Sequence, residues 1–403
     1  MMVVMKRRDG LIARREAMGF TQEAFAHEVG TDLRTVGRWE RGEATPRPDR
    51  RADLARLLKV SLSELDVLLR VEPVPSSGLP NQDEKGVEWS APIEPVLDDL
   101  RKALFGQYVT SHAAEPNPAQ ERPEDLVVRI HNLYQMADYD GSARLLPPLI
   151  ARVEGASATV RAGAYLAAAK LASKVGDTGL AWVTADRCRS AAMEAESPAL
   201  LGIANCQIAQ ALLRDGRVVE AEQTAGGAVE DLARASSASE DSVSAHGALV
   251  LLLAVIAARR GEAQAAKRNL YQAADLAETL GREDNRLWTA FGPTNVAIHE
   301  LSVHVALGDS RTAAQLGGSV DTDALPNVLR GRRSQVHLEL AWAAAGQDDD
   351  SLAVLHLLET ERVAKQVISR NTTARSLLHK LLAREHVGAT PGLRALAGRA
   401  GVL

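Results

Sequence analysis

The stretch TQEAFAHEVGTDLRTVGRWERGEATPRPD, residues 21–49, predicts two short helices joined by a tight turn. Thr21 and Asp32 are good N-cap residues, because their side-chain oxygens can accept backbone N–H groups that a helix leaves unpaired at its start. Gly30 stands where a helix would end in the left-handed conformation. Two short helices around a glycine-containing turn form a helix-turn-helix.

The first seventy residues are predicted to contain five short helices. Their expected ranges are 9–18, 21–30, 33–41, 48–58 and 61–70. The second helix would bury Phe25, Ala26 and Val29, and the third would bury Val36 and Trp39. These apolar positions leave the opposite face of the third helix to polar residues.

That opposite face carries a row of arginines. Arg34, Arg38 and Arg41 follow at spacings of four and three, so they share one side of a helix. A solvated charged face is the usual meaning of such a row. The caps, the glycine turn and the core positions around it favour a functional surface instead.

Residues 9–70 resemble the lambda-repressor/Cro-like (XRE) family of helix-turn-helix domains. The resemblance rests on Arg15, Gly19, Thr21-Gln22, Phe25-Ala26, Val29-Gly30, Val36, Trp39-Glu40-Arg41-Gly42, Pro46 and the tail LARLLKVSLSEL (54–65). It implies a domain that lays its third helix in the major groove of DNA. It also implies an internal ion pair between Arg15 and Glu40.

The resemblance assigns base contacts to the third helix. Arg34 and Arg38 fall where the family contacts base edges, and arginine there can bind guanine in bidentate fashion. Thr35 lies on the groove-facing side, where a base or a phosphate is within reach. Leu33 departs from the polar residue usual in the family, so contact with a thymine methyl group and partial burial both stay open. Gly37 is expected to let the helix sit deeper in the groove.

Phosphate contacts are assigned around this helix. Gln22, at the start of the second helix, matches a position at which the family contacts phosphate or a base. Arg41 and Arg47 are placed for phosphates, which position the protein without reading sequence.

The whole chain is predicted to be all-α and to form more than one domain. Its 403 residues exceed one ordinary core, and 46% of them are hydrophobic while only 3% are aromatic. Ala and Leu therefore dominate the core, and both favour helices. Residues 1–70 carry 14 Lys and Arg against 11 Asp and Glu, whereas the remainder carries 33 against 41. A mildly basic head on an acidic body fits a small anion-binding module on a scaffold.

Several classes of function lack support in the sequence. Cys188 and Cys206 are too few for a disulfide framework, so buried free thiols are expected. The start MMVVMKRRDG lacks the apolar run of a signal peptide, and ALVLLLAVIAA (248–258) is too short to span a bilayer. Hydrolase, nucleotide-binding and zinc-protease motifs are absent, so no enzymatic activity, cofactor or metal is expected. We expect a cytoplasmic, nucleoid-associated protein that does not bind membranes.

Residues 71–123 have the composition of a linker, with a helix expected at 92–106, and residues 124–403 alternate long helices with glycine turns. The turn landmarks are Gly141, Gly176, Gly216, Gly261, Gly308 and Gly346, at intervals of 35, 40, 45, 47 and 38 residues. Periods of this size indicate an α-solenoid of stacked helix pairs. The pattern resembles six or seven degenerate tetratricopeptide (TPR) repeats, with HEAT-like and other helical repeats left open.

A head and body of these kinds together resemble bacterial regulators of an actinobacterial type, most closely in FGPTNVAIHELSVHVALGD (291–309). The resemblance implies a body that dimerises and senses a signalling peptide, a small molecule or a protein. Partners usually dock on the first helices of such repeats, where Asn side chains can pair with a peptide backbone. The candidate ligand contacts are Asn205, Trp288, Asn295, His299 and Arg333, with Tyr134 as a further apolar contact. Capping or core roles are the alternative for each.

The sequence therefore predicts a sequence-specific DNA-binding transcriptional regulator that binds a palindromic operator in double-stranded DNA as a homodimer. The alternative is a protein-interaction scaffold, in which the repeats bind a partner protein and DNA binding is secondary. The intact row of Arg34, Thr35 and Arg38 favours the regulator.

Overall fold

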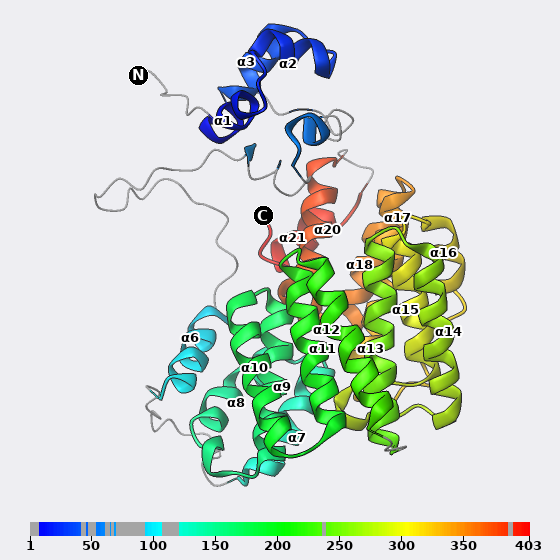
Figure 1. Cartoon of the computed structure of the whole chain (residues 1–403). Coiled ribbons are helices and arrows are strands. Elements are labelled where there is room, and N and C mark those ends of the chain that lie inside the picture. The colour runs from blue at the N-terminus through cyan, green and yellow to red at the C-terminus, as the bar shows by residue number, and fades with distance from the viewer. Residues whose placement is uncertain are drawn as a thin grey trace. The chain divides into compact units, whose positions relative to one another are not determined.

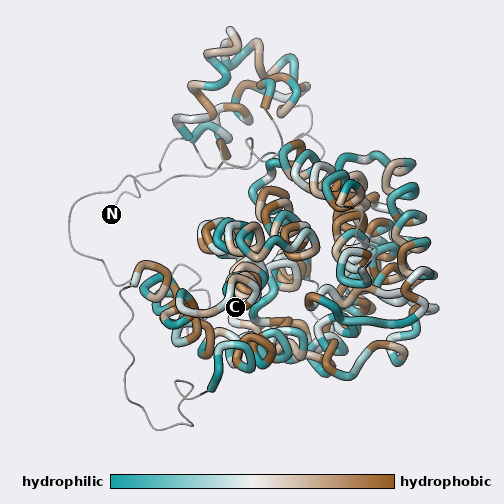
Figure 2. Tube along the Cα trace, turned by 60° about the horizontal axis from the view of Figure 1, so that its bottom comes forward, coloured by the Kyte–Doolittle hydropathy of each residue, from teal (hydrophilic) through white to brown (hydrophobic). Residues whose placement is uncertain are grey.

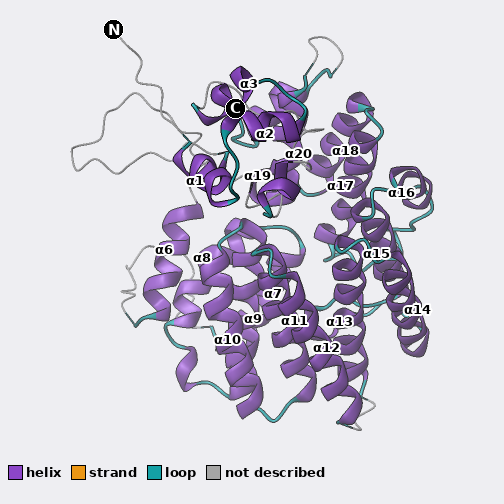
Figure 3. Cartoon of the chain, turned by 45° about the horizontal axis from the view of Figure 1, so that its top comes forward, coloured by secondary structure: helices purple, strands orange, loops and turns teal. Residues whose placement is uncertain are grey.

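The computed structural model describes residues 8–41, 46, 54–60, 65, 68–69, 93–106, 121–235, 239–385 and 390–403. Helices make up its secondary structure, and no strand occurs among these residues (Figure 3). The chain separates into two compact units, Met1–Glu84 and Lys85–Leu403 (Figure 1). The prediction of an all-α protein is confirmed.

The N-terminal unit begins with α1 (Asp9–Ala17), α2 (Gln22–Val29) and α3 (Leu33–Glu40), and residues 54–58 are also helical. Thr21 Oγ1 accepts a hydrogen bond from the Ala24 N–H at 3.1 Å, and Asp32 Oδ1 accepts one from the Thr35 N–H at 2.8 Å. Gly30 ends α2 with φ of 68°, in the left-handed region. Both predicted caps and the predicted glycine turn are confirmed.

One hydrophobic core holds these helices together. Its buried members are Leu11, Phe25, Ala26, Val29, Val36, Trp39, Leu54, Ala55, Leu58, Leu65 and Leu69. Every residue predicted to face inward from α2 and α3 is among them. The predicted start of the fourth helix at 48–53, most of the fifth helix at 61–70 and the linker at 71–91 lie outside the described residues.

The second unit begins with α6 (Ile93–Leu104), the helix predicted at 92–106, and α6 packs on α8. Helix pairs follow, and in each pair the two helices pack against each other. The pairs are α7 (Pro123–Gln135) with α8 (Tyr139–Ile150), α9 (Ala158–Val175) with α10 (Thr178–Glu194), α11 (Pro198–Arg214) with α12 (Val218–Arg234), α13 (Glu240–Arg259) with α14 (Ala263–Leu280), α15 (Pro293–Ala306) with α16 (Ser310–Gly317), and α17 (Arg330–Gly346) with α18 (Asp350–Val363).

Further helices complete the described part of this unit. They are the 3-10 turns η2 (Val153–Gly155) and η3 (Arg286–Trp288), and the C-terminal helices α19 (Lys365–Arg370), α20 (Thr372–Ala383) and α21 (Leu393–Arg399). Apolar and polar stretches alternate along the helices (Figure 2), as expected where each helix buries one side against its neighbours.

Glycine turns separate the helices of four pairs, as predicted. Gly176, Gly216, Gly261 and Gly308 have φ between 77° and 92°, which is strained for residues with a Cβ atom. The prediction was wrong at the other two landmarks. In the first pair the left-handed residue is Ala137, with φ of 62°, and in the last pair it is Asp348, with φ of 61°.

Gly141 and Gly346 lie within helices instead. Gly141 is in the first turn of α8, where the carboxylate of Asp138 accepts its N–H at 2.9 Å, and a Cβ there would collide with that carboxylate. Gly346 is the last residue of α17, and a Cβ there would collide with Ser310 Oγ. Close packing, rather than a left-handed turn, accounts for these two glycines.

The first helices of the pairs form a closed circuit of contacts. Helix α7 packs on α9, α9 on α11, α11 on α13, α13 on α15, α15 on α17, and α17 again on α7. The C-terminal helices reinforce this closure, because Arg370 of α19 donates to both carboxylate oxygens of Asp140 in α8, at 2.9 and 3.2 Å. The unit is therefore not an open row of repeats with two free ends.

Helix α13 contains the apolar stretch 248–258. Its length and hydropathy would suffice to cross a membrane, but 67% of the apolar window is buried inside the unit. Gly247 shows how tightly this helix is packed, because a Cβ at that position would overlap the ring of Phe291. The prediction of a buried helix here is confirmed.

Candidate nucleic-acid interface and ligand cavity

Helix α3 exposes the side predicted to read DNA. Arg34, Arg38 and Arg41 are exposed, and Leu33 is 47% exposed. On the opposite side Val36 and Trp39 are 1% and 5% exposed. The structure therefore brings the three arginines and Leu33 together on one accessible surface. Arg47 lies outside the described residues.

Asp32 fixes the start of α3 and with it the position of Thr35. Asp32 accepts the Thr35 N–H at 2.8 Å and the Thr35 hydroxyl at 2.9 Å. These hydrogen bonds, the backbone one first, lower the pKa of Asp32. Because its hydroxyl hydrogen already goes to Asp32, Thr35 can meet a base or phosphate only as an acceptor or through its methyl group.

A buried carboxylate links α1, α2 and α3. Glu40 Oε1 accepts from Arg15 Nε at 2.6 Å, which confirms the predicted ion pair, and the two side chains are 3% and 6% exposed. The other oxygen of Glu40 accepts from Gln22 Nε2. The prediction of a DNA contact by Gln22 did not include this tie, which orients the amide at the start of α2.

Gly37 lies directly beneath the guanidinium group of Arg41. A Cβ at Gly37 would come 3.0 Å from Arg41 Nη1. The bare glycine thus provides the surface on which this arginine rests. That placement gives Gly37 a local role in addition to the predicted closer approach to DNA.

The second unit, Lys85–Leu403, is named here the helical-pair unit. It contains a cavity of about 250 Å³, and the first helices of its closed circuit surround this cavity. Every first helix contributes to its wall, together with η3 and the start of α8. The lining residues are Tyr134, Gln135, Tyr139, Lys170, Lys174, Ile203, Cys206, Gln207, Gln210, Ala248, Leu251, Leu252, Val255, Trp288, Thr289, Ala290, Asn295, His299, Leu329, Gly331, Arg332 and Gln335.

The wall of this cavity is cationic. Lys170, Lys174 and Arg332 line it, and within the described part of the chain no Asp or Glu side chain does. Burial lowers the pKa of Lys170 to about 8 and that of Lys174 to about 7, and the charge of Arg332 adds to both shifts. Lys170 Nζ donates to the Trp288 carbonyl at 2.8 Å, whereas Lys174 has no hydrogen bond or ion pair with another described residue.

Two residues of the same wall, Asn295 and Gln207, have buried amide side chains with an unpaired oxygen. Asn295 is 2% exposed and Gln207 is 4% exposed, and neither Asn295 Oδ1 nor Gln207 Oε1 has a hydrogen-bond partner among the described residues. Buried acceptors in proteins are normally paired, so each such oxygen calls for an explanation.

One wall is a strained loop, residues 281–292, named here the cavity loop. Leu287, Trp288 and Ala290 have φ values of 49°, 55° and 56°. Left-handed residues other than glycine cost on the order of 1 kcal/mol each and persist only where their surroundings hold them. The indole of Trp288 is held by His131, whose ring is stacked on it with centroids 3.7 Å apart.

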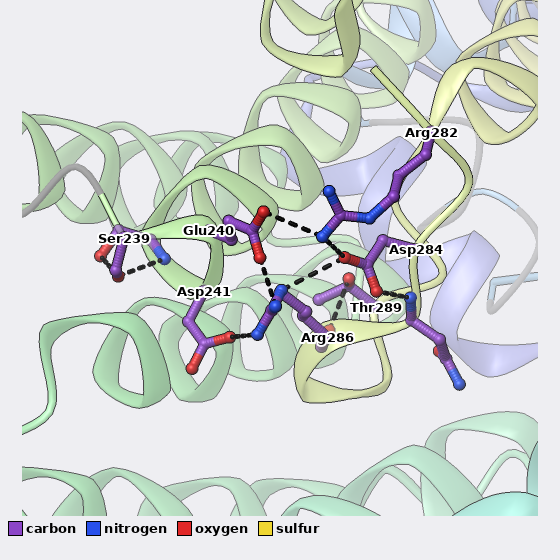
Figure 4. A network of polar contacts seen from close by, with 9 residues as sticks. Ser239, Glu240, Asp241, Arg282, Asp284, Arg286 and Thr289 are labelled. Carbon is purple, nitrogen blue, oxygen red and sulfur yellow. Dashed lines mark hydrogen bonds and ion pairs between the residues drawn. The ribbon is translucent and has the colours of Figure 1, made fainter. Parts of the chain in front are cut away.

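Ion pairs to the start of α13 also hold the cavity loop (Figure 4). Arg282 Nη2 donates to Glu240 Oε1 at 2.9 Å, and Arg286 donates to Glu240 as well. Arg286 Nη1 additionally donates to Asp241 Oδ1 at 3.1 Å. These contacts tie the loop to the start of α13.

Three of the five predicted ligand contacts, Trp288, Asn295 and His299, line the cavity, as does Tyr134. Asn205 does not. Arg333 does not either, because its guanidinium donates to the carbonyls of Thr322 and Leu325 at 3.1 and 2.6 Å.

Sequence reasoning missed the two lysines, Gln207 and Arg332. The run AAAKLASKV (167–175) carried a signal, because its two lysines are four residues apart in a helix otherwise made of small and apolar residues.

Comparison with known families supports the assignment of the N-terminal unit. The family profile described as helix-turn-helix matches residues 11–65. No curated protein matches the chain. Residues 11–65 thus form an XRE-type helix-turn-helix domain, a type of domain that implies DNA binding, ahead of a large all-helical region of paired helices.

Proposed function

We propose that the protein is a sequence-specific transcriptional regulator, in which α3 reads operator DNA while the helical-pair unit dimerises and senses a ligand. The exposed row of Arg34 and Arg38 carries this proposal. It lies on a helix whose start is capped by Asp32 and whose end is anchored through Glu40. A rigid helix that presents arginines can bind guanine edges in the major groove.

The proposal includes two features of the body. Its helix pairs are of the tetratricopeptide kind, supported by four left-handed glycine turns between paired helices. Two copies of the chain would place two α3 helices on half-sites about one helical turn apart, so the operator would be palindromic. A regulator that binds operator DNA would act inside the cell, where that DNA is.

The test is recovery of bound fragments from sheared genomic DNA by the full-length protein. We expect the wild type to enrich a shared palindromic motif and Arg38→Ala to lose preference at one base position. Arg189→Ala is the matched control, because Arg189 is an exposed arginine of α10 that forms an ion pair with Asp186. Equal, unselective binding by wild type and Arg38→Ala would favour the scaffold alternative.

The sensing part has its own readout. A ligand that binds two conformations of the body equally cannot shift DNA binding. We therefore expect operator affinity to change when a ligand occupies the cavity. Sedimentation of the full-length protein with and without operator tests the dimer.

A further inference from the structure

We infer that the central cavity of the helical-pair unit binds a small organic anion that also carries an N–H or O–H donor group. This inference deepens the sensing part of the proposed function and rests on it. The acid group would lie among Lys170, Lys174 and Arg332, and the donor would face Asn295 and Gln207.

Charge balance is the first reason. Three cationic side chains meet at one cavity without a carboxylate among the described residues of its wall. Like charges brought together at one wall repel each other, and a folded chain gains nothing from that arrangement by itself. An acid group of a ligand would supply the missing negative charge through charge-assisted hydrogen bonds.

The unpaired buried oxygens are the second and independent reason. Asn295 and Gln207 lie on different helices, α15 and α11, both residues line the cavity, and each has a buried amide oxygen that lacks a partner among the described residues. An amide oxygen accepts hydrogen bonds and repels an anion, so it selects a donor group. The wall therefore fits a ligand that carries both an acid group and a hydrogen-bond donor.

The rest of the cavity wall limits the size of the ligand and favours an apolar side chain on it. Trp288, Leu251, Leu252 and Val255 give apolar surface, and a cavity of about 250 Å³ is below the ordinary range of pockets for drug-sized ligands. Because the first helices close into a circuit, the site favours a compact metabolite over an extended peptide. An amino or hydroxy acid with an apolar side chain has the required groups.

The first experiment needs no ligand. Lys174→Met in the full-length protein removes a charge that has no partner among the described residues while keeping the length of the side chain. We expect the melting temperature of the unliganded protein to rise. Lys102→Met is the control, because Lys102 is exposed on α6 and pairs with Asp99, and no rise is expected there. A lower melting temperature for Lys174→Met alone would show that the lysine serves the fold, and would overturn the inference.

The second experiment measures binding without DNA. The probes are inorganic phosphate and a panel of small aliphatic and aromatic amino acids, hydroxy acids and plain acids, each compared with its uncharged amide. We expect an acid of the panel to stabilise wild type more than its amide, and Lys174→Met and Arg332→Gln to bind it about tenfold or more weakly, the size of one charge-assisted hydrogen bond. Asn295→Leu should weaken binding of acids that carry a donor group and leave plain acids unaffected.

Failure of this inference is distinguishable from failure of the proposed function. Wild type that recovers an operator motif but prefers no acid over its amide overturns the anion site and leaves DNA reading intact. An acid that binds the cavity without changing operator affinity supports the site and contradicts its role in sensing. Preference for phosphate alone, with no organic acid bound, overturns the requirement for a donor group.

Discussion

The imidazole of His131 in α7 is stacked on the indole of Trp288 in the cavity loop, with ring centroids 3.7 Å apart and ring planes 4° from parallel. His131 is fully buried, and its Nε2 lies 2.9 Å from the Gly163 carbonyl oxygen. The stack joins residues 157 positions apart and presses a strained segment against the first helix pair. Because α7 belongs to the closed circuit and Trp288 lines the cavity, the stack connects the circuit with the cavity wall.

The stack gives a prediction for stability in acid. Burial holds the pKa of His131 well below 6.5, and it lowers that of His299 to about 3. The unfolded chain binds these protons first, so stability is full above about pH 6.5 and is lost as the pH falls toward the folded-state values. Urea unfolding of the wild type should have a lower midpoint at about pH 5 than at about pH 7.5, because these two pH values lie on either side of the pKa of an unfolded histidine.

Variants separate packing from titration in that prediction. His131→Phe keeps a flat ring and removes the proton, so its midpoint should depend less on pH than that of the wild type. His131→Ala should lose about 2–5 kcal/mol at neutral pH, as when a large buried side chain is removed. Equal pH dependence in wild type and His131→Phe would contradict the role given to this histidine.

Removal of single arginines from the DNA-reading surface should separate two kinds of contact. Arg38→Ala is expected to relax specificity at one base pair by about 1–3 kcal/mol, because it would remove a base contact. Arg41→Ala is expected to weaken all sequences alike and to reduce the slope of log affinity against log salt by about 1, as loss of a phosphate contact does. Titration of operator and scrambled DNA at several salt concentrations measures both. Identical profiles for the two variants would refute this division of roles.

Loss of one partner from the buried Arg15–Glu40 pair should destabilise the N-terminal unit. Arg15→Met leaves the Glu40 carboxylate buried with Gln22 as its one side-chain partner among the described residues, at a cost of about 3–5 kcal/mol. Adding Glu40→Gln should recover part of the loss, because the uncompensated charge is gone. Hydrogen exchange of the amides in α1 to α3 reports on this unit separately from the body. A larger loss in the double variant than in Arg15→Met would contradict the prediction.

Binding of an organic anion in the cavity should weaken as the solution becomes alkaline. Lys174, with a pKa of about 7, and Lys170, with a pKa of about 8, hold the charge that binds the anion, and both lose it as pH rises through these values. Isothermal titration from about pH 6 to about pH 9 should show the affinity falling across this window. Lys174→Met should keep only the part of the fall that belongs to Lys170.

Other groups that face the two lysines do not reverse this sign. Arg214 and Arg332 face Lys174 and stay cationic. The thiols of Cys188 and Cys206, near Lys170, have pKa values raised by burial to about 12 and about 11, so they stay neutral across the window. An affinity that rises with pH would point to a different group.

The ion pairs behind the cavity loop should affect motion more than global stability. The side chains of Arg286 and Glu240 are 38% and 43% exposed, and exposed pairs contribute about 0–1 kcal/mol. Arg286→Ala should leave the melting temperature nearly unchanged while accelerating amide exchange in residues 281–292. Arg234→Ala, in an exposed pair on α12, is the control. Unchanged exchange in the loop would show that packing alone holds it.

Local chemistry explains why much of the N-terminal unit was predictable from the sequence. The Thr21 cap, the Gly30 turn and the Asp32 cap depend on residues within a few positions of one another. The Arg15–Glu40 pair spans a longer distance and was found through family resemblance. The hydrogen bond from Gln22 to Glu40 depends on tertiary packing between α2 and α3, so the sequence pattern did not predict it.

The helix pairs of the helical-pair unit were predictable from the spacing of its glycines. Two of its turns and its cavity were not. Glycine spacing gave the helix pairs, but Ala137 and Asp348 occupy left-handed turns that residue type alone assigns to glycine. The cavity brings Lys174 of α9 beside Arg332 of α17, which are far apart in the chain. Such a meeting follows from closure of the circuit, and no local period encodes closure.

Closure has a consequence for how the body comes apart and how it could change in evolution. In a linear array each unit touches only its neighbours, so units fray from the ends and can be gained or lost there. Here α17 returns to α7, and Arg370 ties α19 to Asp140 of α8, so the first and last pairs are also neighbours. Unfolding should be all-or-none rather than stepwise, and the number of pairs should be invariant, because one pair more or fewer would leave a ring that no longer joins.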